Sequence, residues 1–151
     1  MRIALYQPDI PQNVGAAIRV AAGFGAGIDL VGPMGFAAGE REIRRVAMDY
    51  ATAGPPAVHA GWTAFLADRA PGRLILLTTR ATSMLWDFSF AESDVILLGR
   101  ESAGVPDEVH ERADARLVIP LAPGARSLNV AVAAAVALAE ARRQQVRTWM
   151  G

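Results

Sequence analysis

The sequence predicts an α/β fold in one domain, built on a mainly parallel sheet with helices on both faces. Strand-like and helix-like segments alternate along the 151 residues, as is typical of parallel strands joined by crossover helices. Two expected strands, residues 73–77 and 94–98, each carry a run of aliphatic residues, as expected where helices cover both faces of a sheet. No linker or internal repeat divides the chain, so we expect residues 1–151 to form a single domain.

The first half of the chain alternates three strands with three helices. Pro8 and Pro11 follow the first strand, and Gly23 and Gly25 close the first helix. Asn13 is the expected N-cap of that helix. The expected elements are strands at 2–6, 28–31 and 57–59, and helices from 13 to 23, from 40 to about 48 and from 63 to 68.

The second half repeats the alternation. Pro106 is expected in the first turn of a short helix, where proline is well tolerated, and Ser127 is the expected N-cap of the final and longest helix. On that helix Val130, Ala134 and Ala137 form a face of small residues, suited to close helix approach in a dimer. The expected elements are strands at 73–77, 94–98 and 116–119, and helices from 106 to 112 and from 127 to about 147.

The composition excludes several kinds of catalysis. All 15 basic residues are Arg, which rules out a P-loop Lys and a Schiff-base Lys. The absence of Cys removes a thiolate nucleophile and argues against a disulfide scaffold. His59 and His110 lack the spacing of a zinc site, so we expect no metal and place both at the surface. Without a membrane-length apolar run or a signal-peptide core, we expect a soluble cytoplasmic protein.

The formal net charge is zero, so RNA binding would require basic residues to gather on one surface. A dimer could place such groups around a common groove. Three aromatic residues in one loop could likewise form a base-stacking surface, or they could serve packing or a dimer contact. The basic clusters are Arg41, Arg44 and Arg45, and Arg142, Arg143 and Arg147; the aromatic residues are Trp86, Phe88 and Phe90.

Three short motifs lie at strand ends or helix starts, where the loops of an open α/β sheet form its ligand crevice. Glycine at a strand end lets the backbone approach a flat ligand closely. Each motif alone also fits a plain structural role: a helix cap with an exposed Arg, a turn into a helix, and a β–α connection. The motifs are Asn13-Val-Gly15 with Arg19, Gly99-Arg-Glu101-Ser-Ala-Gly104-Val-Pro106, and Ile119-Pro120-Leu121 followed by Ser127-Leu128-Asn129.

Besides these three motifs, the glycine-rich segment Gly23-Phe-Gly25-Ala-Gly27 invites comparison with a dinucleotide-binding fingerprint. That fingerprint needs its glycines after a strand and at the opening of a helix. Here the glycines follow a helix and precede a strand. A helix C-cap with a tight turn is therefore the better interpretation.

In this order and at these separations, the three motifs resemble those of the SPOUT-class RNA 2′-O-methyltransferases. The closest match is with the short TrmL-type enzymes, which methylate the wobble nucleotide of tRNA, and it runs from Ile3 to about Gln145. The resemblance implies a deep trefoil knot in the C-terminal half, with S-adenosylmethionine bound inside it largely by main-chain groups. It also implies a homodimer that acts on the tRNA anticodon stem-loop.

The resemblance further implies roles for individual residues. Arg19 matches an Arg at the reacting ribose, either as the base or, since a guanidinium pKa exceeds ~12, as a clamp on the phosphate and the developing alkoxide. The implied catalytic residues are Arg19, Asn13 and Ser127. The implied cofactor-binding residues are Leu77, Gly99, Ile119, Ser127 and Leu128. The residues implied to contact RNA are Arg19, Arg41, Arg45 and Asn129.

Two departures from the family bear on the choice of target nucleotide. Gly23-Phe24-Gly25 stands where Asn-Thr-Gly is common, and Ala139 stands where an aromatic residue is common. Both positions lie in regions that the family uses for dimer packing or the substrate face. The alternatives are therefore methylation of another tRNA or rRNA nucleotide, or a non-catalytic module that binds RNA or nucleotides. Retention of the residues in all three motifs favours an enzyme.

Overall fold

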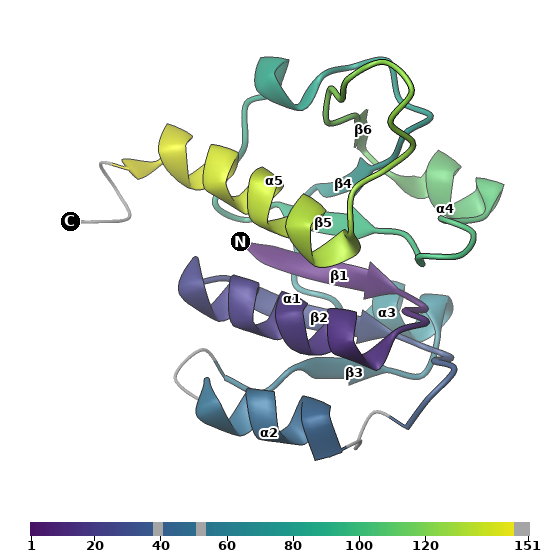
Figure 1. Cartoon of the computed structure of the whole chain (residues 1–151), viewed down its shortest axis with the longest axis vertical. Helices are drawn as coiled ribbons and strands as arrows, with labels where there is room; N and C mark the ends of the chain where they lie inside the picture. Colours follow the sequence, from purple (N-terminus) through teal and green to yellow (C-terminus); the bar gives the residue numbers. More distant parts are fainter. Residues whose placement is uncertain (38–40, 51–53, 147–151) are drawn as a thin grey trace.

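The computed structural model describes residues 1–37, 41–50 and 54–146. Its centre is a six-stranded sheet in the order β3-β2-β1-β5-β4-β6 (Figure 1), and each pair of neighbouring strands is parallel. The prediction of an α/β fold on a mainly parallel sheet is confirmed. The strands are β1 (Arg2–Tyr6), β2 (Gly27–Val31), β3 (Ala57–His59), β4 (Leu74–Leu77), β5 (Val95–Leu98) and β6 (Ala115–Leu117).

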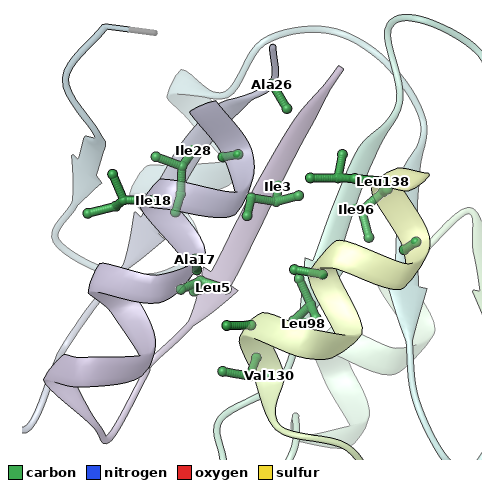
Figure 2. Close-up of a cluster of buried hydrophobic side chains, with 14 of the residues drawn as sticks. Ile3, Leu5, Ala17, Ile18, Ala26, Ile28, Ile96, Leu98, Val130 and Leu138 are labelled. Atoms are coloured by element: carbon green, nitrogen blue, oxygen red, sulfur yellow. The ribbon is translucent and has the colours of Figure 1, made fainter. Parts of the chain in front are cut away.

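Helices cover both faces of the sheet, as predicted. The side chains of β1 alternate between the two faces: Ile3 and Leu5 join the core beneath α1 and α5 (Figure 2), whereas Ala4 and Tyr6 join the core beneath α3 and α4. Within the described residues, no helix is long and apolar enough to cross a membrane. On the first face lie α1 (Pro11–Gly23), α2 (Arg41–Asp49) and α5 (Val130–Gln144), and on the second α3 (Trp62–Asp68) and α4 (Asp107–Arg112).

The neighbouring strands β1 and β5 send their chains to opposite faces of the sheet. After β1 the chain turns to α1 on one face, and after β5 it turns to α4 on the other. The two loops therefore diverge and leave a crevice beyond the carboxyl ends of these strands, which is the usual ligand position in an open α/β sheet.

Helices α1 and α5 pack directly on each other over the sheet. Small side chains allow the close approach, because Ala17 of α1 and Ala134 and Ala137 of α5 are buried in the same core. The face of α5 that we assigned to a dimer, Val130 with these two alanines, is therefore used inside the chain, and that prediction was wrong. Helical spacing shows which residues share a face, but not which neighbour they meet.

Two helices have other N-caps than predicted, and α4 begins at Asp107, so that Pro106 is its N-cap and not part of its first turn. α1 starts at Pro11, because the fixed φ of proline suits the first helical position, and Ile10 rather than Asn13 is its N-cap. α5 starts at Val130, where the Oδ1 atom of Asn129, not Ser127, accepts hydrogen bonds from the backbone of the first turn. At the other end of α1 the predicted tight turn is confirmed, with Gly25 at a φ of 61°.

The connection between β4 and β5 lies against the end of β6. It contains a short 3₁₀ helix, η2 (Leu85–Asp87). The backbone N–H of Val118 donates to the carbonyl of Ser83 at 2.9 Å, and the N–H of Leu85 donates to the carbonyl of Val118 at 2.9 Å. The connection is therefore fixed beside the point where the chain leaves β6 for α5.

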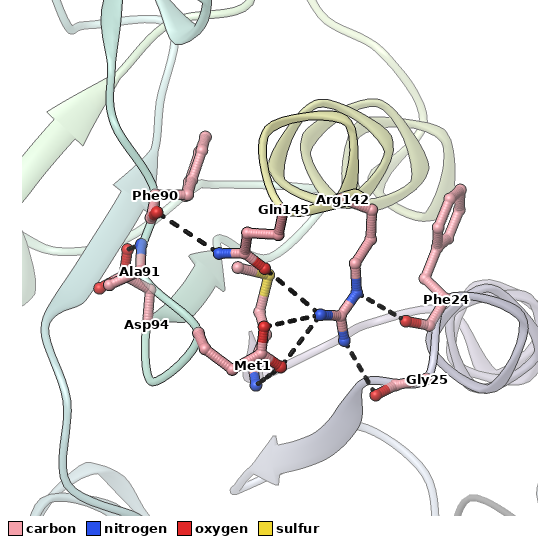
Figure 3. A network of polar contacts seen from close by, with 9 residues as sticks. Met1, Phe24, Gly25, Phe90, Ala91, Asp94, Arg142 and Gln145 are labelled. Atoms are coloured by element: carbon pink, nitrogen blue, oxygen red, sulfur yellow. Dashed lines mark hydrogen bonds and ion pairs between the residues drawn. The ribbon is translucent and has the colours of Figure 1, made fainter. Parts of the chain in front are cut away.

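Arg142, predicted to belong to a basic surface cluster, is instead buried, with 4% of its surface exposed. Its guanidinium donates to the carbonyls of Phe24 at 2.9 Å and Gly25 at 3.1 Å, and it pairs with Glu92 at 2.8 Å (Figure 3). It thus joins the end of α5 to the end of α1 and to the β4–β5 connection. The cationic side chain also meets carbonyls at the C-terminal end of α1, where a positive charge is favourable.

Arg143, the other member of that predicted cluster within the described residues, is not free either. Arg143 is exposed but forms an ion pair with Glu140 at 2.8 Å. Hydrogen bonds from Arg143 and Gln144 lower the pKa of Glu140 to about 2. Arg147 lies outside the described residues. The end of α5 therefore carries balanced charges.

His59, expected at the surface, is buried with 8% of its surface exposed. Its Nε2 atom lies 2.8 Å from Oδ1 of Asp29, whose other oxygen accepts a hydrogen bond from Nε of Arg2 at 2.6 Å. A buried polar ring needs such a partner. The partner comes from another strand, which sequence spacing could not show; His110, by contrast, is half-buried.

The three aromatic residues of the β4–β5 connection divide between packing and exposure. Phe88 and Phe90 form an edge-to-face pair with ring centroids 4.9 Å apart, and the guanidinium of Arg73 lies 4.9 Å from the centre of the Phe88 ring. Trp86 in η2 is 49% exposed. The packing interpretation therefore holds for the two phenylalanines, whereas base stacking by the exposed Trp86 stays a prediction.

Candidate active site

A cavity of about 570 Å³ opens at the carboxyl ends of β4, β5 and β6. Its walls come from three segments: residues 77–79 after β4, residues 98–105 after β5, and residues between 118 and 130 after β6. Ile10 and Asn13 at the start of α1 close one side. The volume lies within the range of small-molecule sites. These are the loops in which the sequence motifs were found.

The five residues predicted to bind the cofactor all line this cavity. They come from different strands and loops, so the fold brings together positions that are far apart in the sequence. These residues are mostly aliphatic side chains and backbone at strand ends. Such a lining suits a flat ring flanked by main-chain donors and acceptors. They are Leu77, Gly99, Ile119, Ser127 and Leu128.

Three asparagine and glutamate side chains join the three motifs by hydrogen bonds. Glu101 accepts from Nδ2 of Asn13 at 3.1 Å, and the Oδ1 atom of Asn13 accepts from Nδ2 of Asn129 at 2.9 Å. Oδ1 of Asn129 caps α5, accepting from the N–H of Ala131 at 2.9 Å. The side chain of Asn13 therefore holds the second and third motifs together at the edge of the cavity, instead of capping its own helix.

Gly99 is required by the hairpin that follows it. The hairpin is closed by hydrogen bonds between Arg100 and Gly104, at 2.9 and 3.1 Å. A Cβ atom on Gly99 would lie 2.7 Å from the Cα and carbonyl carbon of Gly104, closer than real Cβ contacts come. From the sequence, Gly99 was predicted to let a ligand approach, and the hairpin supplies a second reason for glycine at this position.

Arg19 does not line the cavity of its own chain. It is exposed on α1, and the central carbon of its guanidinium lies 5.6 Å from the centre of the Tyr50 ring, beyond the end of α2. Arg41 and Arg45 are also exposed, on the adjacent helix α2. Among the described residues no hydrogen-bond partner of the Arg19 guanidinium is found, which leaves its donors open to another molecule.

Asp9, in the loop between β1 and α1, was not predicted from the sequence as part of the site. Its carboxylate accepts hydrogen bonds from Arg100 and from Ser102 in the hairpin after β5. The hydrogen bond from Arg100, followed by those from Ser102, holds the pKa of Asp9 well below its usual value. A signal was present, since an acidic residue lies three positions after the end of a buried strand, beside the crevice. Its arginine partner, however, lies 91 positions away.

No group of three or more His, Cys, Asp or Glu side chains that could hold a metal ion occurs in the described part of the chain. The polar groups of the residues around the cavity are backbone groups, side-chain hydroxyls and amides, the Glu101 carboxylate and the guanidinium groups of Arg100 and Arg126. These can orient a small molecule.

This chain is similar to one known protein family and to relatives that share one name. Residues 1–139 match the SpoU rRNA Methylase family. A protein of Ancylobacter novellus named tRNA (cytidine(34)-2'-O)-methyltransferase is 53% identical over 146 residues, which are 95% of this chain and 92% of that protein. A protein of Escherichia coli K12 with the same name is 35% identical over 95% of this chain and 93% of its own length.

Two solved structures extend the comparison. One, described as giving structural insights into the 2-OH methylation of C/U34 on tRNA, superposes with a TM-score of 0.88 at 38% identity and covers 97% of this chain and 96% of that one. The other is the SpoU methyltransferase AviRb from Streptomyces viridochromogenes in complex with AdoMet, with a TM-score of 0.84 at 26% identity. It covers 97% of this chain and 61% of its own.

Proposed function

This chain belongs to the SpoU rRNA Methylase family, and we propose that it transfers a methyl group from S-adenosylmethionine to the ribose 2′-hydroxyl of the wobble nucleotide 34 of tRNA. The observation that carries the proposal is the convergence of Asn13 from the first motif with the second and third motifs on one cavity of about 570 Å³. Relatives that match nearly the whole chain and bear the name of this activity support it.

The cavity suits S-adenosylmethionine in size and chemistry. Apolar walls from Leu77, Ile119 and Leu128 would flank the flat base, and the backbone around Gly99 would approach it closely. Ser127 would contribute its hydroxyl at the exposed rim. When bound, the cofactor supplies a methyl group already activated on a sulfonium sulfur, so the protein has to contribute position and electrostatics.

We assign to Arg19 the binding of the RNA phosphate and of the developing 2′-alkoxide. A guanidinium rarely gives up its proton, because its pKa lies above ~12, and its planar fork binds phosphate oxygens in pairs. The other role proposed for such a residue, as the base, is disfavoured on the same ground. Asn13 would hold Glu101 and Asn129 in place at the rim, where Asn129 would also contact the RNA.

We propose that the protein works as a two-fold homodimer in which Arg19 of one subunit serves the cavity of the other. Arg19 follows Asn13 by six residues, or about 9 Å along a helix, and it does not line its own cavity. Since Val130, Ala134 and Ala137 are used inside the chain, we place the interface on exposed apolar residues near the cavity mouth. These are Ile10 (41% exposed), Leu128 (37%) and Val132 (49%).

In such a dimer the exposed Arg41 and Arg45 would extend the basic surface for the anticodon stem-loop. We also propose that the whole chain forms one domain and that its C-terminal half is knotted. The β4–β5 connection is hydrogen-bonded to Val118, where the chain leaves β6 for α5. This contact supports the knot.

The function is tested by incubating the protein with labelled S-adenosylmethionine and either unmodified tRNA or unmodified rRNA, and then mapping the 2′-O-methyl group. Label at nucleotide 34 is expected. Label at another tRNA or rRNA nucleotide would give the protein a different target, and RNA binding without label would indicate a non-catalytic module.

Shared active sites are tested by co-expressing two inactive variants, Arg19→Ala and Gly99→Val. A mixed dimer would combine the intact cavity of the first variant with the Arg19 of the second. We expect activity to return in mixed dimers and to be absent from each variant alone. Absence of activity in purified mixed dimers would place Arg19 at the cavity of its own chain.

A further inference from the structure

One side chain, Asp9, ties the loop after β1 to the hairpin after β5. It lies at the point where these two neighbouring strands send their chains to opposite faces of the sheet. Asp9 itself does not line the cavity, whereas hairpin residues 100–104 form one of the cavity walls. The position of this wall therefore depends on contacts made behind it.

Both oxygens of the Asp9 carboxylate are occupied by hairpin donors. Oδ2 accepts from the backbone N–H of Ser102 at 3.0 Å and from its hydroxyl at 2.6 Å. Oδ1 accepts from Nε of Arg100 at 3.1 Å and also from Nη2 of the same guanidinium. Charge-assisted contacts of this kind fix geometry as well as adding energy.

A third contact runs in the other direction. The backbone N–H of Asp9 donates to Oε2 of Glu101 at 2.8 Å. Three consecutive hairpin residues, 100 to 102, are thus all bound to one residue of the opposite loop. Without Asp9, Glu101 would keep its hydrogen bond to Asn13. Its two neighbours in the hairpin, Arg100 and Ser102, would lose their hydrogen bonds to Asp9.

The same contacts hold the loop after β1 in an uncommon conformation. Gln7 has a φ of 41°, in the left-handed region that residues other than glycine rarely adopt. Its side chain accepts from Arg100 at 3.3 Å, and its backbone N–H donates to the carbonyl of Val31 at 2.7 Å. Arg100 therefore fixes both the shape of this loop and its distance from the hairpin.

We propose that Asp9 is a positioning residue for the cofactor, which holds the 100–104 hairpin in the form that completes the cavity wall without touching the ligand. The inference rests on the proposed function, because the ligand is taken to be S-adenosylmethionine. If the hairpin also samples open forms, only the closed fraction binds, and apparent affinity falls with that fraction. Saturating cofactor would draw the hairpin closed again.

The test compares cofactor affinity with turnover in Asp9→Asn, which keeps the size of the side chain and removes its charge. Calorimetry with S-adenosylmethionine and with its demethylated product should show binding about ten-fold weaker or more, as expected when charged hydrogen bonds are lost. At saturating cofactor, kcat on tRNA should change by less than about three-fold, because the bound ligand restores the closed form. A role in overall folding alone would leave the affinity of the folded protein unchanged.

Two further variants sharpen the result. Asp68→Asn is the matched control: this carboxylate is exposed on α3, on the face opposite α1 and α5, and should leave cofactor affinity unchanged. Arg100→Met removes the same ion pair, between Arg100 and Asp9, by changing the partner in the hairpin. Its effect on affinity should largely disappear in the Asp9→Asn background, as a double-mutant cycle measures.

The outcomes separate this inference from the proposed function. Wild-type protein that binds no cofactor and methylates no tRNA would overturn the proposed function. Wild-type protein that does both, with unchanged cofactor affinity in Asp9→Asn, would overturn the positioning role. If Asp9→Asn does not fold, Arg100→Met decides instead: affinity weakened about ten-fold supports the role, and wild-type affinity refutes it.

Discussion

Replacing the buried Arg142 by Met should destabilise the protein substantially. The guanidinium is the donor to two carbonyls at the end of α1, those of Phe24 at 2.9 Å and Gly25 at 3.1 Å, and it pairs with Glu92 at 2.8 Å. Methionine fills a similar volume but donates no hydrogen bond, so both carbonyls lose their charged donor.

The magnitude follows from these contacts. A hydrogen bond to a charged group contributes about 1.5–3 kcal/mol, so the two bonds to the carbonyls at about 2 kcal/mol each give about 4 kcal/mol. The pair with Glu92 adds little, because 66% of the glutamate side chain is exposed and water replaces the lost partner. For a chain of this size each kcal/mol lowers Tm by about 2–4 °C, which gives a fall of about 8–16 °C.

The assay is thermal denaturation followed by circular dichroism, with Arg112→Met as the control. Arg112 is exposed at the end of α4, and substitutions at such surface positions change stability by about 0.5 kcal/mol or less. If Arg142→Met melted within about 2 °C of both the wild type and the control, the buried guanidinium would not hold α5 to α1, and this reasoning would be wrong.

Three more predictions follow from the site. Gly99→Val should abolish cofactor binding in calorimetry, because its Cβ would lie 2.7 Å from the Gly104 backbone; Gly23→Ala, whose Cβ meets nothing within 4 Å, is the control, and equal binding by both variants would contradict the argument. Arg19→Ala should keep cofactor affinity while lowering turnover about 100-fold or more, and Arg19→Lys should rescue poorly because it lacks the planar fork; full turnover in the alanine variant would make Arg19 a plain surface charge. The pKa of Glu140 is lowered from 4.5 to about 2 by its hydrogen bonds with Arg143 and Gln144, so its stabilisation is present above pH 4.5 and is lost as pH falls toward 2. The drop in Tm over that interval should be smaller in Glu140→Gln, and an identical drop would refute this assignment.

The strands could be predicted from the sequence because their signal is local. The aliphatic runs Leu74–Leu77 and Val95–Leu98 match β4 and β5, and the first predicted strand matches β1 at both ends. Parallel strands covered on both faces need little more than a short apolar run. The fold class therefore followed from pattern alone.

Helix starts were less predictable, since several nearby residues can cap. At the start of α1 the fixed φ of Pro11 prevailed over the capping capacity of Asn13, and at α5 the cap went to Asn129 rather than Ser127. In both cases the displaced residue lies at the cavity rim instead. The short polar side chains that can cap a helix are also the ones that line the cavity rim, so the residue type alone does not show which role each one takes.

The long-range contacts lay beyond sequence reasoning. Burial of Arg142 depends on two carbonyls more than 100 positions away, and burial of His59 depends on Asp29 in the neighbouring strand. The Asp9 contacts likewise join loops that meet only because β1 lies beside β5. A resemblance to known motifs located the cavity residues, but it could not reveal what holds them in place.

The central claim is most directly tested with two anticodon stem-loops that differ only at nucleotide 34, one with a ribose and one with a 2′-deoxyribose. Each is incubated with the protein and S-adenosylmethionine and then analysed by mass spectrometry of its nuclease fragments. The account predicts a mass gain of one methyl group on the fragment containing nucleotide 34 in the ribose form, and no gain in the deoxy form. Methylation of the deoxy form, or of neither, would contradict it.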